Sequence, residues 1–372
     1  MSADLVLILG AGASVPYGFP TGNELRHWVC DLWTDAGLGD VSHDFNFHRN
    51  PSRSARTLHV LEMLGVEAHR IRNVGRMLAQ SKLPSIDRLV FHRSEEIGAV
   101  SRLLISAMLL DSESNAALEN CRTDGDWFVA LWTSLTAGRK SLADVPTDKL
   151  TIFSFNYDRS LEALFLSACK ATYGVDSSEA AEFVSKISIE HFYGNTTQIF
   201  DLDPSGVPFD CQRTDLHTAV EKAAKEIYLI DDHRKRQATA FSNARIAFEQ
   251  AKVVTFLGYG FDEINDTSLG IADWMSEINI HNKTLLVHNY GEQNFRQTSS
   301  GKVEVDPNLV MKTVRLIPKF QCTTFGMYER EVDAALSRIG LKRGSEAGQI
   351  SPLSKDCYQA LREWGTFDLL RS

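Results

Sequence analysis

The sequence predicts an α/β protein with a mostly parallel sheet, helices on both faces of that sheet and a helical insertion. Two observations lead to this prediction. Apolar runs at residues 5–9 and 253–257 are each followed by glycine, as buried strands of parallel sheets usually are, and residues 150–155 also show strand character. Longer segments with apolar residues at helical spacing separate these runs, and such alternation is typical of α/β folds.

The other elements follow from the same patterns. After the first strand we expect a helix over 23–33, with Asn23 as its cap because an Asn side chain can accept from a free helix N–H. Residues 57–145 show helical patterns and no convincing strand, so they form the predicted insertion. The remaining expectations are helices over 57–80, 85–110, 126–138, 159–172, 216–250, 267–279, 327–340 and 355–370, and strands at 187–193, 284–288 and 309–317.

Charge and hydropathy argue against two kinds of partner. The chain has 39 Lys and Arg against 48 Asp and Glu, a formal net charge of −9. Direct nucleic-acid binding usually needs a basic surface, and the densest basic cluster, 233–236, is typical of a solvated helix face, with a phosphate or partner contact as the alternative. No apolar run reaches the roughly 20 residues of a membrane-spanning helix and no secretory signal is present, so we expect a cytoplasmic protein.

The six cysteines indicate reduced thiols rather than a metal site. No two of them lie within four positions of each other, so the paired spacing of a structural zinc site is absent, as is H-E-x-x-H. We therefore expect no metal.

A glycine-rich turn, Gly10-Ala11-Gly12-Ala13-Ser14, follows the first strand. Such a turn lets a diphosphate approach the backbone, and the next helix offers free N–H groups. The dinucleotide fingerprint G-x-G-x-x-G is incomplete, because Val15 stands where the third glycine would be. The turn alone is compatible with a nucleotide site or with an ordinary strand-to-helix connection.

Four further polar or glycine-rich signals stand where predicted strands end. Each also has a structural interpretation: a helix cap, a satisfied structural histidine or a simple turn. If the strands are parallel, however, all these ends share one edge of the sheet, where ligands of open α/β folds bind. The signals are Ser154-Phe155-Asn156-Tyr157-Asp158, His191-Phe192-Tyr193-Gly194-Asn195, Gly258-Tyr259-Gly260-Phe261-Asp262 and His288-Asn289-Tyr290.

The order and content of these motifs resemble the sirtuin superfamily. The first glycine turn, followed by Gly18-Phe19-Pro20, is similar to that family's loop around the NAD diphosphate. The resemblance implies catalytic roles for Asn156 and Asp158, with His191, or less favourably Tyr193, at the position of the family's histidine. It implies cofactor contacts from Gly10, Ala11, Gly12, Ala13, Ser14, Pro20, Thr21, Ser154, Gly258, Tyr259, Gly260 and Asn289.

Three departures refine the resemblance. The chain lacks the two C-x-x-C pairs of the protein deacylases, and Thr21-Gly22-Asn23 replaces their D-F-R after the proline. Both changes, together with the segment 85–89, resemble the sirtuin-like NADases of bacterial anti-phage defence. The family's histidine directly precedes a glycine, whereas here Tyr193 does so. His191 lies two residues earlier, on the same face if the strand continues through both.

The resemblance implies an NAD+ hydrolase that releases nicotinamide and ADP-ribose and acts as a gated effector of abortive infection. The alternatives are a regulatory subunit that binds NAD or ADP-ribose with little catalysis, a deacylase or ADP-ribosyltransferase, and a Rossmann dehydrogenase. Implied partners are a hexameric ATPase, an Argonaute-like protein, a nucleotide sensor or further copies of the chain. Residues 1–290 would form the NAD-binding domain, and 291–372 an α/β extension that completes it or forms an assembly surface.

Overall fold

The computed structural model describes fourteen stretches of the chain. They are residues 4–34, 51–119, 126–211, 215–229, 234–259, 265, 268–269, 284–289, 295–297, 303–305, 311–316, 320–324, 350–353 and 370–371. The predicted helices over 267–279, 327–340 and 355–370 lie almost entirely outside these residues, as does Gly260.

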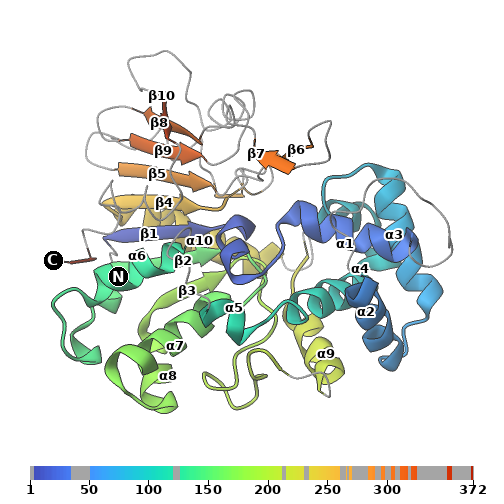
Figure 1. The fold of residues 1–372 in the computed structure, drawn as a ribbon, viewed down its shortest axis with the longest axis horizontal. Coiled ribbons are helices and arrows are strands. Elements are labelled where there is room, and N and C mark those ends of the chain that lie inside the picture. The colour runs from blue at the N-terminus through green and yellow to red at the C-terminus, as the bar shows by residue number, and fades with distance from the viewer. Residues whose placement is uncertain are drawn as a thin grey trace.

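The fold is centred on one mostly parallel sheet (Figure 1). Its strands are β1 (Leu5–Leu9), β2 (Leu150–Ser154), β3 (Ser188–His191), β4 (Val253–Leu257), β5 (Thr284–Asn289), β8 (Met311–Leu316), β9 (Phe320–Thr324) and β10 (Ile350–Leu353). Their order is β10-β8-β9-β5-β4-β1-β2-β3. Neighbours from β3 to β9 are parallel, whereas β8 and β10 are antiparallel to their neighbours. A separate ribbon pairs β6 (Phe295–Gln297) with β7 (Val303–Val305).

The direction in which strands are added reverses at β1. The chain proceeds from β1 outward to β2 and β3, then returns to the other side of β1 to form β4 and β5. Such a reversal opens a crevice at the carboxyl ends of the two strands that flank it, and ligands of open α/β sheets bind there. The predicted α/β fold with a Rossmann-like, mostly parallel sheet is confirmed.

Helices from the first third of the chain gather beyond the carboxyl ends of the strands (Figure 1). They are α1 (Gly22–Thr34), α2 (Pro51–Met63), α3 (Ala68–Ser81) and α4 (Ile86–Leu110), and α9 (Leu216–Glu226) packs on α4. The insertion continues through α5 (Asn115–Glu119) and α6 (Trp127–Thr136). Residues of helix α4 lie close to the edge of the sheet at which the strands end and the predicted motifs begin.

Helices cover both faces of the sheet, as predicted. On one face, Leu7 and Ile152 belong to a core that includes Phe165 of α7 (Ser160–Tyr173). On the other, Phe256 of β4 contacts Phe248 of α10 (Arg234–Gln250), with ring centroids 6.4 Å apart. Because both faces are buried, the central strands read as continuous apolar runs rather than alternating ones.

Several elements differ from the sequence expectations. The helix over 57–80 divides into α2 and α3, because Gly65 adopts a left-handed φ of +78° that ends the first helix. The helical segment 216–250 divides into α9 and α10, with extended backbone at Ile227 (φ −79°, ψ 128°). Helix α8 (Ser177–Lys186), capped by the Asp176 carboxylate on the Glu179 N–H, was not predicted.

The cap of α1 is Thr21 rather than Asn23. The Thr21 hydroxyl accepts from the Glu24 N–H at 3.2 Å, while Glu24 Oε2 accepts from the Thr21 N–H at 2.8 Å. This reciprocal pair is a capping box, which needs Thr and Glu three residues apart. Among the helices that fall within the described ranges, none combines the length and apolarity needed to cross a membrane.

Candidate functional site

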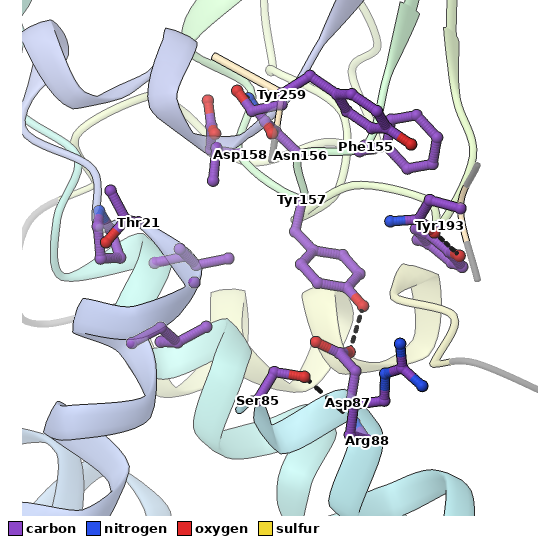
Figure 2. A pocket seen from close by; sticks show the side chains of 17 residues that line it. Thr21, Ser85, Asp87, Arg88, Phe155, Asn156, Tyr157, Asp158, Tyr193 and Tyr259 are labelled. Carbon is purple, nitrogen blue, oxygen red and sulfur yellow. Dashed lines mark hydrogen bonds between the residues drawn. The ribbon is translucent and has the colours of Figure 1, made fainter. Parts of the chain in front are cut away.

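A cavity of about 260 Å³ lies at the carboxyl ends of β1 and β2, at the reversal point of the sheet (Figure 2). This volume is near the lower end of small-molecule sites, roughly 300 Å³. The loop after β1, the segment after β2, and the turns after β3 and β4 form its sheet side. The starts of α1 and α4 form the opposite side, so the helical insertion contributes to the wall.

The glycines of the first and fourth strand ends bring two loops into direct contact. A Cβ on Gly10 would lie 2.4 Å from the Gly258 oxygen. A Cβ on Gly258, whose φ is +60°, would lie 2.0 Å from the Ala13 nitrogen. Any larger residue would separate the loops, so these glycines are required by the contact between β1 and β4 connections.

The same contact uses most of the N–H groups of the first loop. The N–H groups of Gly10 and Gly12 donate to carbonyls at the end of β4, at 2.9 and 3.0 Å. Those of Ala13 and Ser14 donate within the turn, at 2.9 and 3.1 Å. The prediction that the loop as a whole offers N–H groups to a diphosphate therefore needs correction. Ala11 alone in this loop has an N–H that no described backbone carbonyl accepts.

Asn156 is held in one orientation in the cavity wall. Its Nδ2 donates to the Gly10 carbonyl and to Ser14 Oγ, at 2.9 Å each, and its N–H donates to Ser154 Oγ at 3.1 Å. A carbonyl can only accept, so the amide nitrogen must face Gly10. The Oδ1 atom is consequently left buried with no hydrogen-bond donor among the described residues.

Asp158 lies next to this arrangement and is also buried. Its Oδ1 accepts from the Ser160 N–H at 3.1 Å and from the Ser160 hydroxyl. Burial raises the pKa of Asp158, and hydrogen bonds from Ser160 and Ser14 offset only part of that rise. Ser14 thus links the Asn156 amide, from which it accepts, to the Asp158 carboxylate, to which it donates.

His191 does not line the cavity. Its Nδ1 lies 2.8 Å from the Asn156 carbonyl oxygen and its Nε2 lies 2.9 Å from Glu162 Oε1 of α7. Strand β3 ends at His191 and a turn follows, so His191 and Tyr193 do not share a face as a continued strand would require. Tyr193 is the residue of this motif that reaches the cavity.

Four aromatic side chains form one side of the cavity (Figure 2): Phe155, Tyr157, Tyr193 and Tyr259. The Phe155 ring lies 5.0 Å from that of Tyr259 and 6.0 Å from that of Tyr193, measured between centroids. The Tyr193 hydroxyl donates to Asn265 Oδ1 at 2.5 Å. Aromatic surfaces of this kind suit a flat heteroaromatic ring.

The first turn of α4 faces these aromatics. Ser85 caps the helix by accepting from the Arg88 N–H at 3.2 Å. Asp87 accepts from the Tyr157 hydroxyl at 2.8 Å, and the Arg88 side chain brings a guanidinium to the cavity (Figure 2). Three residues of the segment 85–89, namely Ser85, Asp87 and Arg88, are therefore part of the site wall.

The structure brings together about half of the residues predicted from sequence. Those that line the cavity are Gly10, Ala11, Pro20, Thr21, Asn156, Asp158, Tyr193 and Tyr259. Those that lie behind the wall are Gly12, Ala13, Ser14, Ser154, His191 and Gly258. The backbone of Asn289 ends β5, and Gly260 lies outside the described residues.

Several lining residues had not been assigned to the site. Phe155 and Tyr157 alternate with the predicted polar residues of the same motif, and that alternation could have indicated them. The residues missed are Gly22, Leu25, Ser85, Asp87, Arg88, Leu109, Phe155, Tyr157 and Asn265. Leu25 and Leu109 read as ordinary core positions of helices, so no local signal distinguishes them.

The described residues contain no group of three or more His, Cys, Asp or Glu side chains placed to hold a metal ion. The chain matches no protein-family model and no curated protein sequence.

Proposed function

We propose that this protein is an NAD+ glycohydrolase, which cleaves the bond between nicotinamide and its ribose. The observation that carries the proposal is the orphaned Asn156 Oδ1, buried in a cavity at the reversal point of a Rossmann-like sheet. A buried acceptor without a donor is costly unless a ligand or water supplies one. A ribose hydroxyl or the attacking water is such a donor.

The rest of the cavity suits the same substrate. The aromatic side formed by Phe155, Tyr157, Tyr193 and Tyr259 offers stacking surfaces for the nicotinamide ring. Arg88 can pair with a phosphate, since a guanidinium binds phosphate oxygens in a fork geometry. On the glycine loop, only the Ala11 N–H has no described backbone acceptor, so the Arg88 guanidinium would make much of the contact with the diphosphate.

The reaction adds water to NAD+ and yields nicotinamide, ADP-ribose and a proton. Nicotinamide leaves as a neutral molecule, so the step needs no strong general acid. The ribose develops oxocarbenium character, as in glycoside hydrolysis. In its ionised form Asp158 would stabilise that positive charge, and Asn156 would orient the ribose or the water.

A second candidate is a regulatory subunit that binds NAD or ADP-ribose without cleaving it. One observation favours it: both ring nitrogens of His191 are engaged, and Tyr193 occupies the cavity instead. Among the described residues that line the cavity, none therefore supplies an imidazole base.

An NADase acting freely would exhaust the cell's own NAD+, so its activity has to be gated. We place the protein among effectors of abortive anti-phage defence. A hexameric ATPase, an Argonaute-like protein, a nucleotide sensor or self-association would release the activity. The lobe of helices α1 to α4 is one candidate surface for that control, because α4 contributes to the cavity wall.

The proposal is tested with the full chain and NAD+, alone and with a lysate of phage-infected bacteria. Calorimetry measures the binding of NAD+ and ADP-ribose, and chromatography measures released nicotinamide. Binding with release supports the hydrolase. Binding without release under either condition supports the regulatory subunit, and failure to bind either nucleotide overturns both.

A further inference from the structure

We infer that His191 and Glu162 form a buried pair that fixes the position of Asn156 from behind, so that His191 is a positioning residue and not the base of the reaction. The inference rests on the proposed function for its kinetic consequences. Its structural part concerns three residues that the fold brings together whatever the substrate is.

The hydrogen bonds of His191 leave it no free lone pair. Its Nδ1 lies 2.8 Å from the Asn156 carbonyl oxygen, which can only accept, so Nδ1 carries a proton. Its Nε2 lies 2.9 Å from Glu162 Oε1, and that contact also needs a proton between the two atoms. An imidazole engaged in this way cannot take a proton from a water in the cavity.

Contact between the two side chains favours the charged form of each partner. Burial alone would lower the pKa of His191, but the charge and hydrogen bond of Glu162 raise it overall. Burial likewise acts to raise the pKa of Glu162, and His191 reverses that effect to lower it. Besides Glu162 of α7, the titratable group acting on His191 is Asp158 of the loop after β2.

With the contact from His191, every polar group of Asn156 except Oδ1 has a hydrogen-bond partner. Ser154 accepts from the Asn156 N–H, Gly10 and Ser14 accept from its Nδ2, and His191 donates to its carbonyl. Ser154 belongs to the same segment as Asn156, whereas Gly10 and Ser14 lie on the loop after β1 and His191 lies on β3. Removing the contact from β3 would let the peptide after Asn156 rotate and would misdirect Oδ1.

Two substitutions separate positioning from base catalysis. The amide nitrogen of Asn occupies nearly the place of histidine Nδ1, whereas that of Gln occupies nearly the place of Nε2. His191→Asn therefore keeps a donor to the Asn156 carbonyl, and it is made together with Glu162→Gln so that no unpaired charge is buried. His191→Gln keeps a donor to Glu162 and loses the contact with Asn156.

For a positioning residue, the His191→Asn/Glu162→Gln chain retains kcat for nicotinamide release within about tenfold of the unaltered chain. His191→Gln loses at least about a hundredfold in kcat while its NAD+ affinity changes by less than about tenfold. Equal loss by both variants, each folded by circular dichroism, overturns the inference, because neither amide can act as a base.

A second measurement does not depend on turnover. In a carbon–proton correlation spectrum, the imidazole signal missing from His191→Asn/Glu162→Gln identifies His191. We expect the midpoint of that signal to lie above the ordinary 6.5, and a midpoint at or below 6.5 overturns the inference. If the unaltered chain releases no nicotinamide but the midpoint is raised, the hydrolase proposal fails and the buried pair stands.

Discussion

The Tyr157 hydroxyl donates to Asp87 Oδ1 at 2.8 Å and so joins the loop that carries Asn156 to the first turn of α4 (Figure 2). A second link lies nearby. Arg159 makes a two-pronged contact with Glu113, with Nε–Oε1 and Nη2–Oε2 distances of 2.6 and 2.8 Å. The helical insertion is thereby tied to the loop on both sides of Asp158.

Loss of the first link should weaken the fold modestly. Tyr157→Phe removes one hydrogen bond to a carboxylate, so we expect the free energy of unfolding to fall by about 1.5–3 kcal/mol. Tyr173→Phe is the matched control, since the Tyr173 hydroxyl makes a longer contact of 3.4 Å with a backbone carbonyl. Urea denaturation measures both, and an equal loss in the two variants would contradict the importance of the Asp87 contact.

Loss of the second link should be severe. Arg159 has no exposed surface, and Arg159→Met would leave the Glu113 carboxylate buried without its cation. We expect a loss of about 3–5 kcal/mol. Lys170→Met, which breaks the exposed pair with Asp201, should cost no more than about 1 kcal/mol. Similar thermal midpoints for the two variants would refute this assignment.

The close approach of the loops after β1 and β4 predicts that a single added methyl group at Gly258 destabilises the protein. Gly258→Ala places a methyl group 2.0 Å from the Ala13 nitrogen at a φ of +60°, so it should destabilise the fold and disrupt the cavity. Gly98→Ala, in the interior of α4 with its nearest neighbours 3.9 Å away, should stabilise by about 0.5–1 kcal/mol. A tolerated Gly258→Ala, judged by its melting temperature, would mean that the loops are not in this contact.

Much of the fold and part of the site can be predicted from local sequence patterns, whereas other parts of the site cannot. The runs Leu5–Leu9 and Val253–Leu257 match their strands, because short, mostly apolar and β-prone runs that end at a glycine are typical of buried strands. The position of Asn156 in the site also follows, since the carboxyl ends of parallel strands share one edge.

The features that the sequence does not predict depend on contacts between segments far apart in the chain. His191 points away from the cavity for two reasons. Strand β3 ends at this residue, and its imidazole contacts Glu162 on α7, a helix that follows β2 rather than β3. The contributions of Asp87 and Arg88 depend on the folding of α4 back over the sheet edge. Neither the orientation of His191 nor the position of α4 produces a periodic pattern in the sequence that could predict it.

The buried Asp158 carboxyl should make stability depend on pH. Its pKa is raised by burial above the ordinary 3.8, so the folded state binds a proton that the unfolded state has already released. The stabilising effect of that proton is complete below pH 3.8 and is lost as pH rises through the raised pKa. Relative to Asp158→Asn, the unaltered chain should therefore lose stability with increasing pH. A difference in urea midpoint that does not change from pH 4 to pH 8 would contradict this expectation.

The most direct test of the proposed site compares nicotinamide release by Asn156→Ala and Asn73→Ala under the condition that gives the highest rate for the unaltered chain. Asn73 lies on α3 and is not part of the cavity wall. We predict that Asn73→Ala keeps full turnover. Asn156→Ala should lose at least about a hundredfold in kcat, the scale of removing one oriented polar group from an active site. Turnover by Asn156→Ala equal to that of Asn73→Ala would contradict the account.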